Sequence, residues 1–385
     1  MASRSISQRA AAFAVVAAFG VGLIGSLSLR PPGSAHDTAA WPSADAGSDQ
    51  TTDRTGAPTG PQIAWRMPTA FGTNLPALGD NPLYVRDALA ASSGGRITLD
   101  IYEPSEIVPA FEITDAVRQR KVEAGYTWLG YDQGRVPASP LLGAVPFGME
   151  PWEFTAWWYE GGGRALGEAL YREQGVHPLL CGIIGPETAG WFRTQVQGLA
   201  DLKGLKIRFA GLGGKVLQRA GASVTMLPGG EIFQALEKGA IDATEYALPV
   251  VDEKLGFDRV APYNYYPGWH QPATAFHLVV NLALWEALRP ADQALLDMAC
   301  TAGVTRNLAR SEGLQGGVIA DFVARGARME TLQPEVLRGL QAITDEVLAE
   351  EAAANPDFAR ILASQKAFRA DYALWKQRAY LPRDF

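Results

Sequence analysis

Strand-like and helix-like patterns alternate at the start of the body of this chain, and this alternation limits the fold more than any other feature. Short runs with strand-type alternation occupy residues 62–68, 96–102 and 125–129. The stretches between them, 82–92 and 111–124, carry apolar residues at helical spacing. A β-α-β-α-β order is typical of an α/β domain built around a largely parallel sheet.

A second set of the same patterns follows further along the chain. Strands are predicted over 179–184, 206–209, 241–246 and 275–282, helices over 215–220 and 231–238, and an aromatic loop over 263–272. Everything after Trp285 has a helical pattern. A chain of 385 residues, 47% of them apolar, is long enough for about two domains. Two α/β lobes with chain crossings between them create a cleft, and such clefts bind small ligands.

The first 60 residues are not expected to belong to this fold. Two arginines precede an apolar run over 10–29, and Gly-Ser-Ala follows at 33–35. This is the pattern of a Sec-type signal peptide, residues 1–35, and it predicts export to the periplasm. An uncleaved membrane anchor is the alternative, because the apolar run is long enough to span a bilayer. Residues 36–60 have too few apolar side chains to fold and are predicted to be a disordered tether.

Charge and motif content exclude several classes of function. The formal charge is -7, and because residues 1–35 carry three arginines and no acid, the remainder carries -10. No basic stripe interrupts this acidity, so nucleic acid is excluded as a partner. The glycine run at 211–214 lacks the third glycine of a dinucleotide loop, since Val216 stands there. No P-loop, HExxH, CxxC or GxSxG motif occurs, so enzymatic catalysis has no positive support.

Several other residues are predicted to be structural. Cys181 and Cys300 lie 119 positions apart in apolar surroundings, and each is interpreted as a small buried hydrophobic residue instead of half of a redox pair or a metal site. His270 and His277 are predicted to be packed or stacked. The aromatic run over 152–159 is predicted to lie in the core or an interface.

Segments spread over most of residues 62–300 resemble the extracytoplasmic solute-binding subunits of TRAP transporters, the DctP-type family. They are 107–116 (IVPAFEITDA), 145–149 (VPFGM), 190–193 (GWFR), 202–214 (LKGLKIRFAGLGG), 227–246 (LPGGEIFQALEKGAIDATEY) and 265–269 (YYPGW). The branch that binds 2-oxoacids or related small carboxylates with a metal ion is the most similar.

The resemblance implies an α/β, two-lobed periplasmic binding protein fold with an interlobe ligand cleft and long C-terminal helices. Lobe I would comprise 61–184 with 274–385, and lobe II 185–273. It also implies a receptor, not an enzyme, that hands a small carboxylate to small and large membrane permease subunits.

The resemblance also assigns a binding site. Arg208 stands where the family pairs a guanidinium with the ligand carboxylate, and a planar fork suits that role. Glu245, the backbone carbonyl of Tyr246 and Gln271 resemble a metal site, and their hard oxygen ligands suit Na or Ca. Tyr246 is also a substrate-binding candidate, and it replaces the tryptophan that is usual in the family.

Glu187 is a second departure, because the family pattern leads us to expect a glutamine there as a substrate contact. A carboxylate only accepts hydrogen bonds and adds negative charge. Three explanations stay open: a ligand with hydroxyl or amine donors, a divalent cation, or an ion pair between Glu187 and Arg193 outside the cleft. Thr188 is a weaker candidate for the same substrate contact.

Two other functions and one assembly are also considered. A secreted hydrolase would use Glu187 and Glu245 as an acid and base pair, and a sensory binding protein would keep the fold without transport. The segment 355–381 is predicted to be a long helix with more apolar residues than one lobe edge buries. Some members of the resembled branch exchange such a helix, which implies a homodimer.

Overall fold

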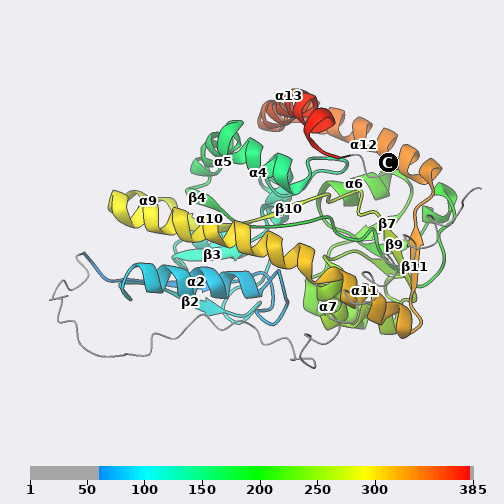
Figure 1. The fold of residues 1–385 in the computed structure, drawn as a ribbon, viewed down its shortest axis with the longest axis horizontal. Helices are drawn as coiled ribbons and strands as arrows, with labels where there is room; N and C mark the ends of the chain where they lie inside the picture. Colours follow the sequence, from blue (N-terminus) through cyan, green and yellow to red (C-terminus); the bar gives the residue numbers. More distant parts are fainter. Residues whose placement is uncertain (1–59, 382–385) are drawn as a thin grey trace, which may run out of the picture. The chain divides into compact units, whose positions relative to one another are not determined.

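The computed structural model describes residues 60–381 (Figure 1). The predicted signal peptide, and the predicted tether except for its last residue, lie outside the described residues. The first strands, β1 (Ile63–Pro68) and β2 (Ile97–Tyr102), pair in parallel through α2 (Asp80–Ser92). This agrees with the predicted strand, helix and strand at the start of the body.

A three-stranded sheet, here called the β4 sheet, continues from this region. It has the order β3-β10-β4, with β3 at Ala124–Thr127, β10 at Thr274–Asn281 and β4 at Val176–Ile184. Every residue of these strands is buried. Both of these pairings are antiparallel, whereas β1 and β2 pair in parallel and a parallel bridge joins Thr69 to Tyr126 of β3, so the predicted parallel arrangement holds for the first three strands and not for β10 and β4. The physical reason is that β10 returns from the far part of the chain, and side-chain periodicity carries no information on strand direction.

A six-stranded sheet, here called the β6 sheet, forms the second part. Its order is β11-β9-β5-β8-β6-β7, with β11 (Arg328–Thr331), β9 (Tyr263–Tyr266), β5 (Gly190–Phe192), β8 (Ala243–Thr244), β6 (Lys206–Arg208) and β7 (Ser223–Thr225). The pairings of β6 with β7 and β8, and of β9 with β11, are parallel, whereas β5 runs antiparallel to both of its neighbours.

Two strands of the β6 sheet depart from the sequence-based expectations. β9 occupies the first half of the predicted aromatic loop, and β11 interrupts the C-terminal region that was predicted to be entirely helical. β11 also lies within 274–385, the range expected for lobe I, yet it pairs with β9.

Helices cover both sheets (Figure 1). α10 (Pro290–Gly313) contacts β4 and α2, and α11 (Gln315–Ala324) packs on α8 (Pro249–Leu255). α12 (Pro334–Ala354) contacts α13 (Pro356–Ala379) and α6 (Gly211–Arg219). The chain therefore ends in two long helices, as expected. Among the described residues, no helix combines the length and the apolar character needed to span a membrane.

The aromatic run is mainly core, as predicted. In α4 (Pro151–Glu160), Phe154, Trp157 and Trp158 are buried, whereas Trp152 is 60% exposed. His277 is also buried, and its ring contacts Trp158 at 5.2 Å between centroids, which confirms the prediction of a packed histidine.

Cys181 and Cys300 form a disulfide bond, so the prediction that they are unpaired is wrong. Both are buried, as expected. Cys181 lies in β4 and Cys300 in α10, and the packing of this helix on this strand brings the two cysteines together. Because the two cysteines are 119 residues apart, their contact cannot be recognised from the sequence alone.

Candidate ligand and metal site

A small cavity lies between the β4 sheet region and the β6 sheet. Its volume is about 300 Å³ with the open solvent at its mouth included, against about 1210 Å³ for a groove elsewhere on the described surface. One part of its wall is aromatic: Phe71, Trp128, Tyr131 and Phe276. Another part is polar: Glu187, Arg208, Glu245, Gln271 and Thr274, together with Tyr246. All predicted ligand and metal residues except Thr188 therefore meet at one cavity.

Arg208 is the last residue of β6, and its side chain is only 1% exposed. Its Nη1 donates to the backbone oxygen of Glu245 at 2.8 Å and to Glu245 Oε1 at 2.6 Å, and its Nε donates to the carbonyl of Leu227 at 3.2 Å. The guanidinium carbon lies 5.2 Å from the ring centre of Tyr246. Burial favours the neutral form of Arg208, but Glu245 outweighs it, and the pKa of Arg208 is raised overall. The guanidinium is therefore charged at the cavity wall.

Glu245 directly follows β8 and is as buried as its partner. Its Oε1 accepts from Arg208 and, at 2.6 Å, from the backbone N–H of Ala210. Burial works to raise the pKa of Glu245, but the charge of Arg208 and the hydrogen bonds lower it overall, so the group is ionised. Its other oxygen, Oε2, is buried and has no hydrogen-bond partner among the described residues.

Glu187 lies in the connection between β4 and β5 and is 4% exposed. Its Oε1 accepts from the hydroxyl of Thr274 at 2.8 Å, and its Oε2 is buried without a hydrogen-bond partner among the described residues. Burial, followed by the negative charge of Glu245, raises the pKa of Glu187. Arg193 donates to the backbone oxygen of Leu236 at 3.4 Å, and no ion pair joins it to Glu187 within the described part of the chain.

Thr188 does not line the cavity. Its hydroxyl accepts from Asn264 Nδ2 at 3.1 Å, and the same amide group donates to the carbonyl of Gly190. Thr188 therefore ties the connection after β4 to strand β9, which places Glu187 at the cavity.

Gln271 is buried, with its Oε1 2.6 Å from the hydroxyl of Thr274. Thr274 is thus shared between Gln271 and Glu187. Tyr246 is half-buried at the cavity wall, and a side chain at Gly229 would collide with its hydroxyl, since a Cβ there would lie 2.3 Å away.

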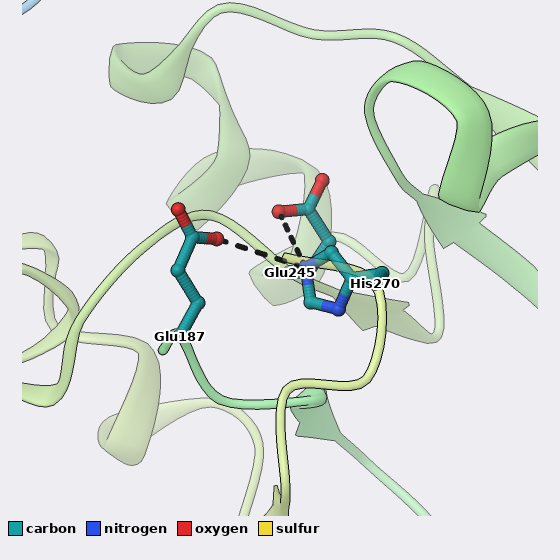
Figure 2. Close-up of side chains that lie close together, drawn as sticks. All are labelled: Glu187, Glu245 and His270. Carbon is teal, nitrogen blue, oxygen red and sulfur yellow. Dashed lines mark ion pairs between the residues drawn. The ribbon is translucent and has the colours of Figure 1, made fainter. Parts of the chain in front are cut away.

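A ring nitrogen of His270 faces both carboxylates (Figure 2). Its Nε2 is 3.6 Å from Glu187 Oε2 and 3.6 Å from Glu245 Oε2. The ring is buried against Phe209, with 4.6 Å between centroids, so the predicted packing is confirmed, whereas the place of His270 beside Glu187 and Glu245 in a candidate metal cluster was not predicted. Burial lowers the pKa of His270, but the two carboxylates raise it overall.

These residues fit a metal ion. One donor atom from each of Glu187, Glu245 and His270 lies within 4.8 Å of the others. The two buried carboxylate oxygens without partners are the positions at which a cation would supply the missing interaction. The two carboxylates of this cluster are hard oxygen donors, which suit Na or Ca.

The glycine run after β6 shapes the cavity. Gly211 opens α6 with φ of +59°, and a Cβ there would lie 2.7 Å from the Trp128 ring. The run therefore lets the helix start close to an aromatic wall, and the N–H of Ala210 just before it reaches Glu245.

Sequence reasoning missed several members of the site. Thr274 and His270 have no motif that marks them as polar site residues, and the aromatic wall comes from distant segments. Tyr131 is one of these wall residues. Burial raises the pKa of its hydroxyl to about 12, so the hydroxyl is neutral at the cavity wall.

The fold and the cavity together define a protein that encloses a small polar ligand between two α/β units. Its family follows from comparison with known proteins. The chain belongs to the bacterial extracellular solute-binding protein family 7, DctP, whose model matches residues 78–355. Members of this family are solute-binding proteins, so the prediction that the chain is not an enzyme is confirmed.

One relative is described as a monocarboxylate 2-oxoacid-binding periplasmic protein of Nostoc sp. (strain PCC 7120). It is 34% identical over 318 residues, which cover 82% of this chain and 87% of that protein. This similarity and the family model confirm the resemblance to DctP-type proteins.

Solved structures of TRAP solute-binding proteins share the fold. One from Bordetella bronchiseptica RB50, with copurified calcium and picolinate, is 32% identical with a TM-score of 0.82, covering 83% of this chain and 95% of that one. One from Colwellia psychrerythraea with bound calcium and pyruvate is 31% identical with a TM-score of 0.79, covering 83% and 97%. One from Pseudoalteromonas atlantica T6c with bound sodium and pyruvate is 32% identical with a TM-score of 0.80, covering 83% and 97%. The expected two-lobed fold is confirmed by these neighbours.

Proposed function

We propose that this protein is the extracytoplasmic solute receptor of a TRAP transporter, and that it binds a small monocarboxylate of the 2-oxoacid or hydroxy acid class together with Na or Ca. The observation that carries the proposal is the buried guanidinium of Arg208 at a cavity that also holds two carboxylate oxygens without hydrogen-bond partners. An anion can lie beside these carboxylates only if a cation accompanies it. Relatives with bound calcium or sodium and pyruvate support this pairing.

Each polar residue of the cavity has a proposed role. Arg208 anchors the ligand carboxylate, because its charged fork lies at the cavity with little access to water. Tyr246 contacts the substrate through its side chain and the metal through its carbonyl, while Glu245 and Gln271 complete the metal site. Glu187 contributes to ligand binding from beside Glu245, and Thr188 acts by fixing the segment that carries Glu187.

The ion would supply positive charge and a coordination point between ligand and protein. The residues of this chain bind the carboxylate, orient it along the aromatic wall and exclude water from it. The aromatic side chains at the wall favour a ligand with a short apolar portion.

We also propose that the protein is exported to the periplasm through the Sec-type signal at 1–35 and that it delivers its ligand to the small and large permease subunits. The Cys181–Cys300 disulfide supports an oxidising compartment. The proposed lobes are 61–184 with 274–385, and 185–273, except that β11 joins the sheet of the second lobe.

A homodimer through α13 is part of the proposal. The end of this helix exposes Leu374 and Trp375, which are 62% and 63% accessible. The relative from Bordetella bronchiseptica is described as a dimer. A second copy would cover this apolar end of the helix.

Calorimetry tests the proposed function directly. Protein freed of metal and ligand should bind pyruvate in buffer with calcium or sodium and should bind it far less in a buffer of a large organic cation. Pyruvate should remain chemically unchanged by NMR. Absence of binding with either ion, to protein that is folded by far-UV circular dichroism, would exclude a receptor for 2-oxoacids.

A further inference from the structure

Two buried carboxylates share the cavity with one basic side chain. Within the described lining residues, Arg208 is the only basic group, and it is paired with Glu245 at 2.6 Å. Glu187 is bonded to the neutral hydroxyl of Thr274 through Oε1, and its Oε2 has no hydrogen-bond partner in the part of the chain that the structure describes. An ionised carboxylate that is buried without a positive partner is strongly unfavourable. Glu187 therefore needs a second source of positive charge.

The unbonded oxygens of the two carboxylates define the position of this positive charge. The unbonded oxygens of Glu187 and Glu245 both lie 3.6 Å from the same atom, His270 Nε2, so the two side chains converge from separate segments (Figure 2). A separation of 3.6 Å is too long for a hydrogen bond. The two oxygens thus flank one common region without being bonded in it.

The charge balance indicates the valence of the ion. With His270 as a neutral imidazole, Glu187, Glu245 and a bound monocarboxylate carry three negative charges, and Arg208 carries one positive charge. A divalent ion balances this set, whereas sodium leaves one negative charge in a nearly water-free cavity. With a neutral glutamine at position 187, the set would carry one negative charge less, and sodium alone would balance it.

We propose that Glu187 is a direct ligand of the metal ion and makes the site select calcium over sodium. This inference rests on the proposed function. Calcium is favoured among divalent ions because Glu187, Glu245 and Gln271 offer hard oxygen donors. Solved structures similar to this chain hold either calcium or sodium, so the fold accommodates both ions.

The test compares Glu187→Gln with Glu312→Gln. Exposed Glu312 is a matched control, because its carboxylate lies against Gly185, two positions from Glu187, and does not line the cavity. Metal-free proteins are prepared with a chelator. Calcium binding is then measured by equilibrium dialysis with elemental analysis, without any carboxylate, and pyruvate binding is measured by calorimetry in calcium or in sodium.

The wild type should bind pyruvate at least tenfold more tightly in calcium than in sodium at equal concentration. Glu187→Gln should lose at least tenfold in calcium affinity and should bind pyruvate in sodium at least as well as the wild type. Glu312→Gln should match the wild type in both ions. Folding is checked by thermal unfolding without metal, where Glu187→Gln should be no less stable because it lacks the buried charge.

Equal pyruvate affinity in sodium and calcium for the wild type would overturn the proposal and would indicate that His270 supplies the charge. Unchanged calcium affinity in folded Glu187→Gln would overturn it as well. Failure of pyruvate to bind with any ion would count against the proposed function instead, and calcium binding measured alone still decides the role of Glu187.

Discussion

At the residue scale, Arg208 is a buried charge that depends on its partners. It is 1% exposed, holds Glu245 in place and is proposed to hold the ligand carboxylate. Loss of one partner of a desolvated charge pair costs about 2 to 5 kcal/mol. Arg208→Ala should therefore weaken pyruvate binding by about 30-fold to several thousandfold, at about 1.4 kcal/mol per tenfold.

Arg208→Lys is the companion variant. A point charge can neutralise Glu245 but cannot reproduce a two-pronged contact, so it should restore only part of the affinity. Calorimetry with pyruvate measures both variants, with far-UV circular dichroism to confirm folding. Affinity within threefold of the wild type for folded Arg208→Ala would mean that the carboxylate is held elsewhere.

Asp132 gives the molecule a stability that depends on pH. Burial raises the pKa of Asp132 to about 6, and the hydroxyl of Tyr171 donates to it at 2.7 Å. In the unfolded chain the pKa of an aspartate carboxyl is about 3.9. Between pH 3.9 and pH 6 the folded state therefore binds more protons at Asp132 than the unfolded state does. The stabilisation from this group is complete below pH 4 and is lost as the pH rises through 6.

Asp132→Asn should remove this dependence while keeping an acceptor for Tyr171. Relative to the wild type, its free energy of unfolding should increase by about 1 to 3 kcal/mol between pH 4 and pH 7.5. Urea denaturation at the two pH values measures the change. The same difference from the wild type at both values would show that Asp132 has an ordinary pKa.

The sequence could predict the residues of the site that lie in continuous motifs. Arg208, Glu245, Tyr246, Gln271 and Glu187 all line the cavity. Thr274 and the aromatic wall could not be predicted, because they become neighbours of the site only when distant segments pack together.

At the element scale, the start of α6 decides the shape of the cavity. Gly211 has a backbone conformation that favours glycine, and its Cα faces the Trp128 ring. Gly211→Ala should lower the free energy of unfolding by about 1 to 3 kcal/mol from backbone strain alone. It should also weaken pyruvate binding, because Trp128 must move from the cavity wall.

Gly230→Ala is the matched control, because it lies in α7 (Gly229–Glu237) with nothing within 4 Å of an added Cβ. Its stability and affinity should stay near those of the wild type. Chemical denaturation and calorimetry are the measurements, and an unaffected Gly211→Ala would show that α6 can begin without a glycine.

The pairing of two strands could not be predicted from the local pattern of apolar and polar residues. The run Tyr263–Tyr266 looks like a loop beside a proline, and it becomes β9 because β5 and β11 bond to its two sides. β11 has no apolar alternation of its own, since its residues are Arg328–Thr331. Both strands are specified by their neighbours and not by their own composition.

At the scale of the whole molecule, the disulfide joins segments that are far apart in the sequence. It links β4 to α10 across 119 residues. A crosslink of this length limits the unfolded chain and contributes about 2 to 5 kcal/mol. Reduction should lower the free energy of unfolding by this amount, measured by urea denaturation with and without dithiothreitol.

A variant with both Cys181 and Cys300 changed to alanine is the control. It should be less stable than the oxidised wild type and should not respond to dithiothreitol. Equal stability of the oxidised and reduced wild type would contradict the prediction.

The near-complete burial of the polar cavity residues has a kinetic consequence. Arg208 and Glu245 are 1% exposed, Glu187 4% and Gln271 5%, so solvent has little access to them in this conformation. A ligand can neither enter nor leave until the walls separate. The lifetime of the complex is then governed by how often the protein opens, and a competitor added in excess cannot hasten departure. A receptor with such a lifetime keeps its ligand bound while it diffuses. Release of the ligand then depends on a partner that stabilises the open conformation.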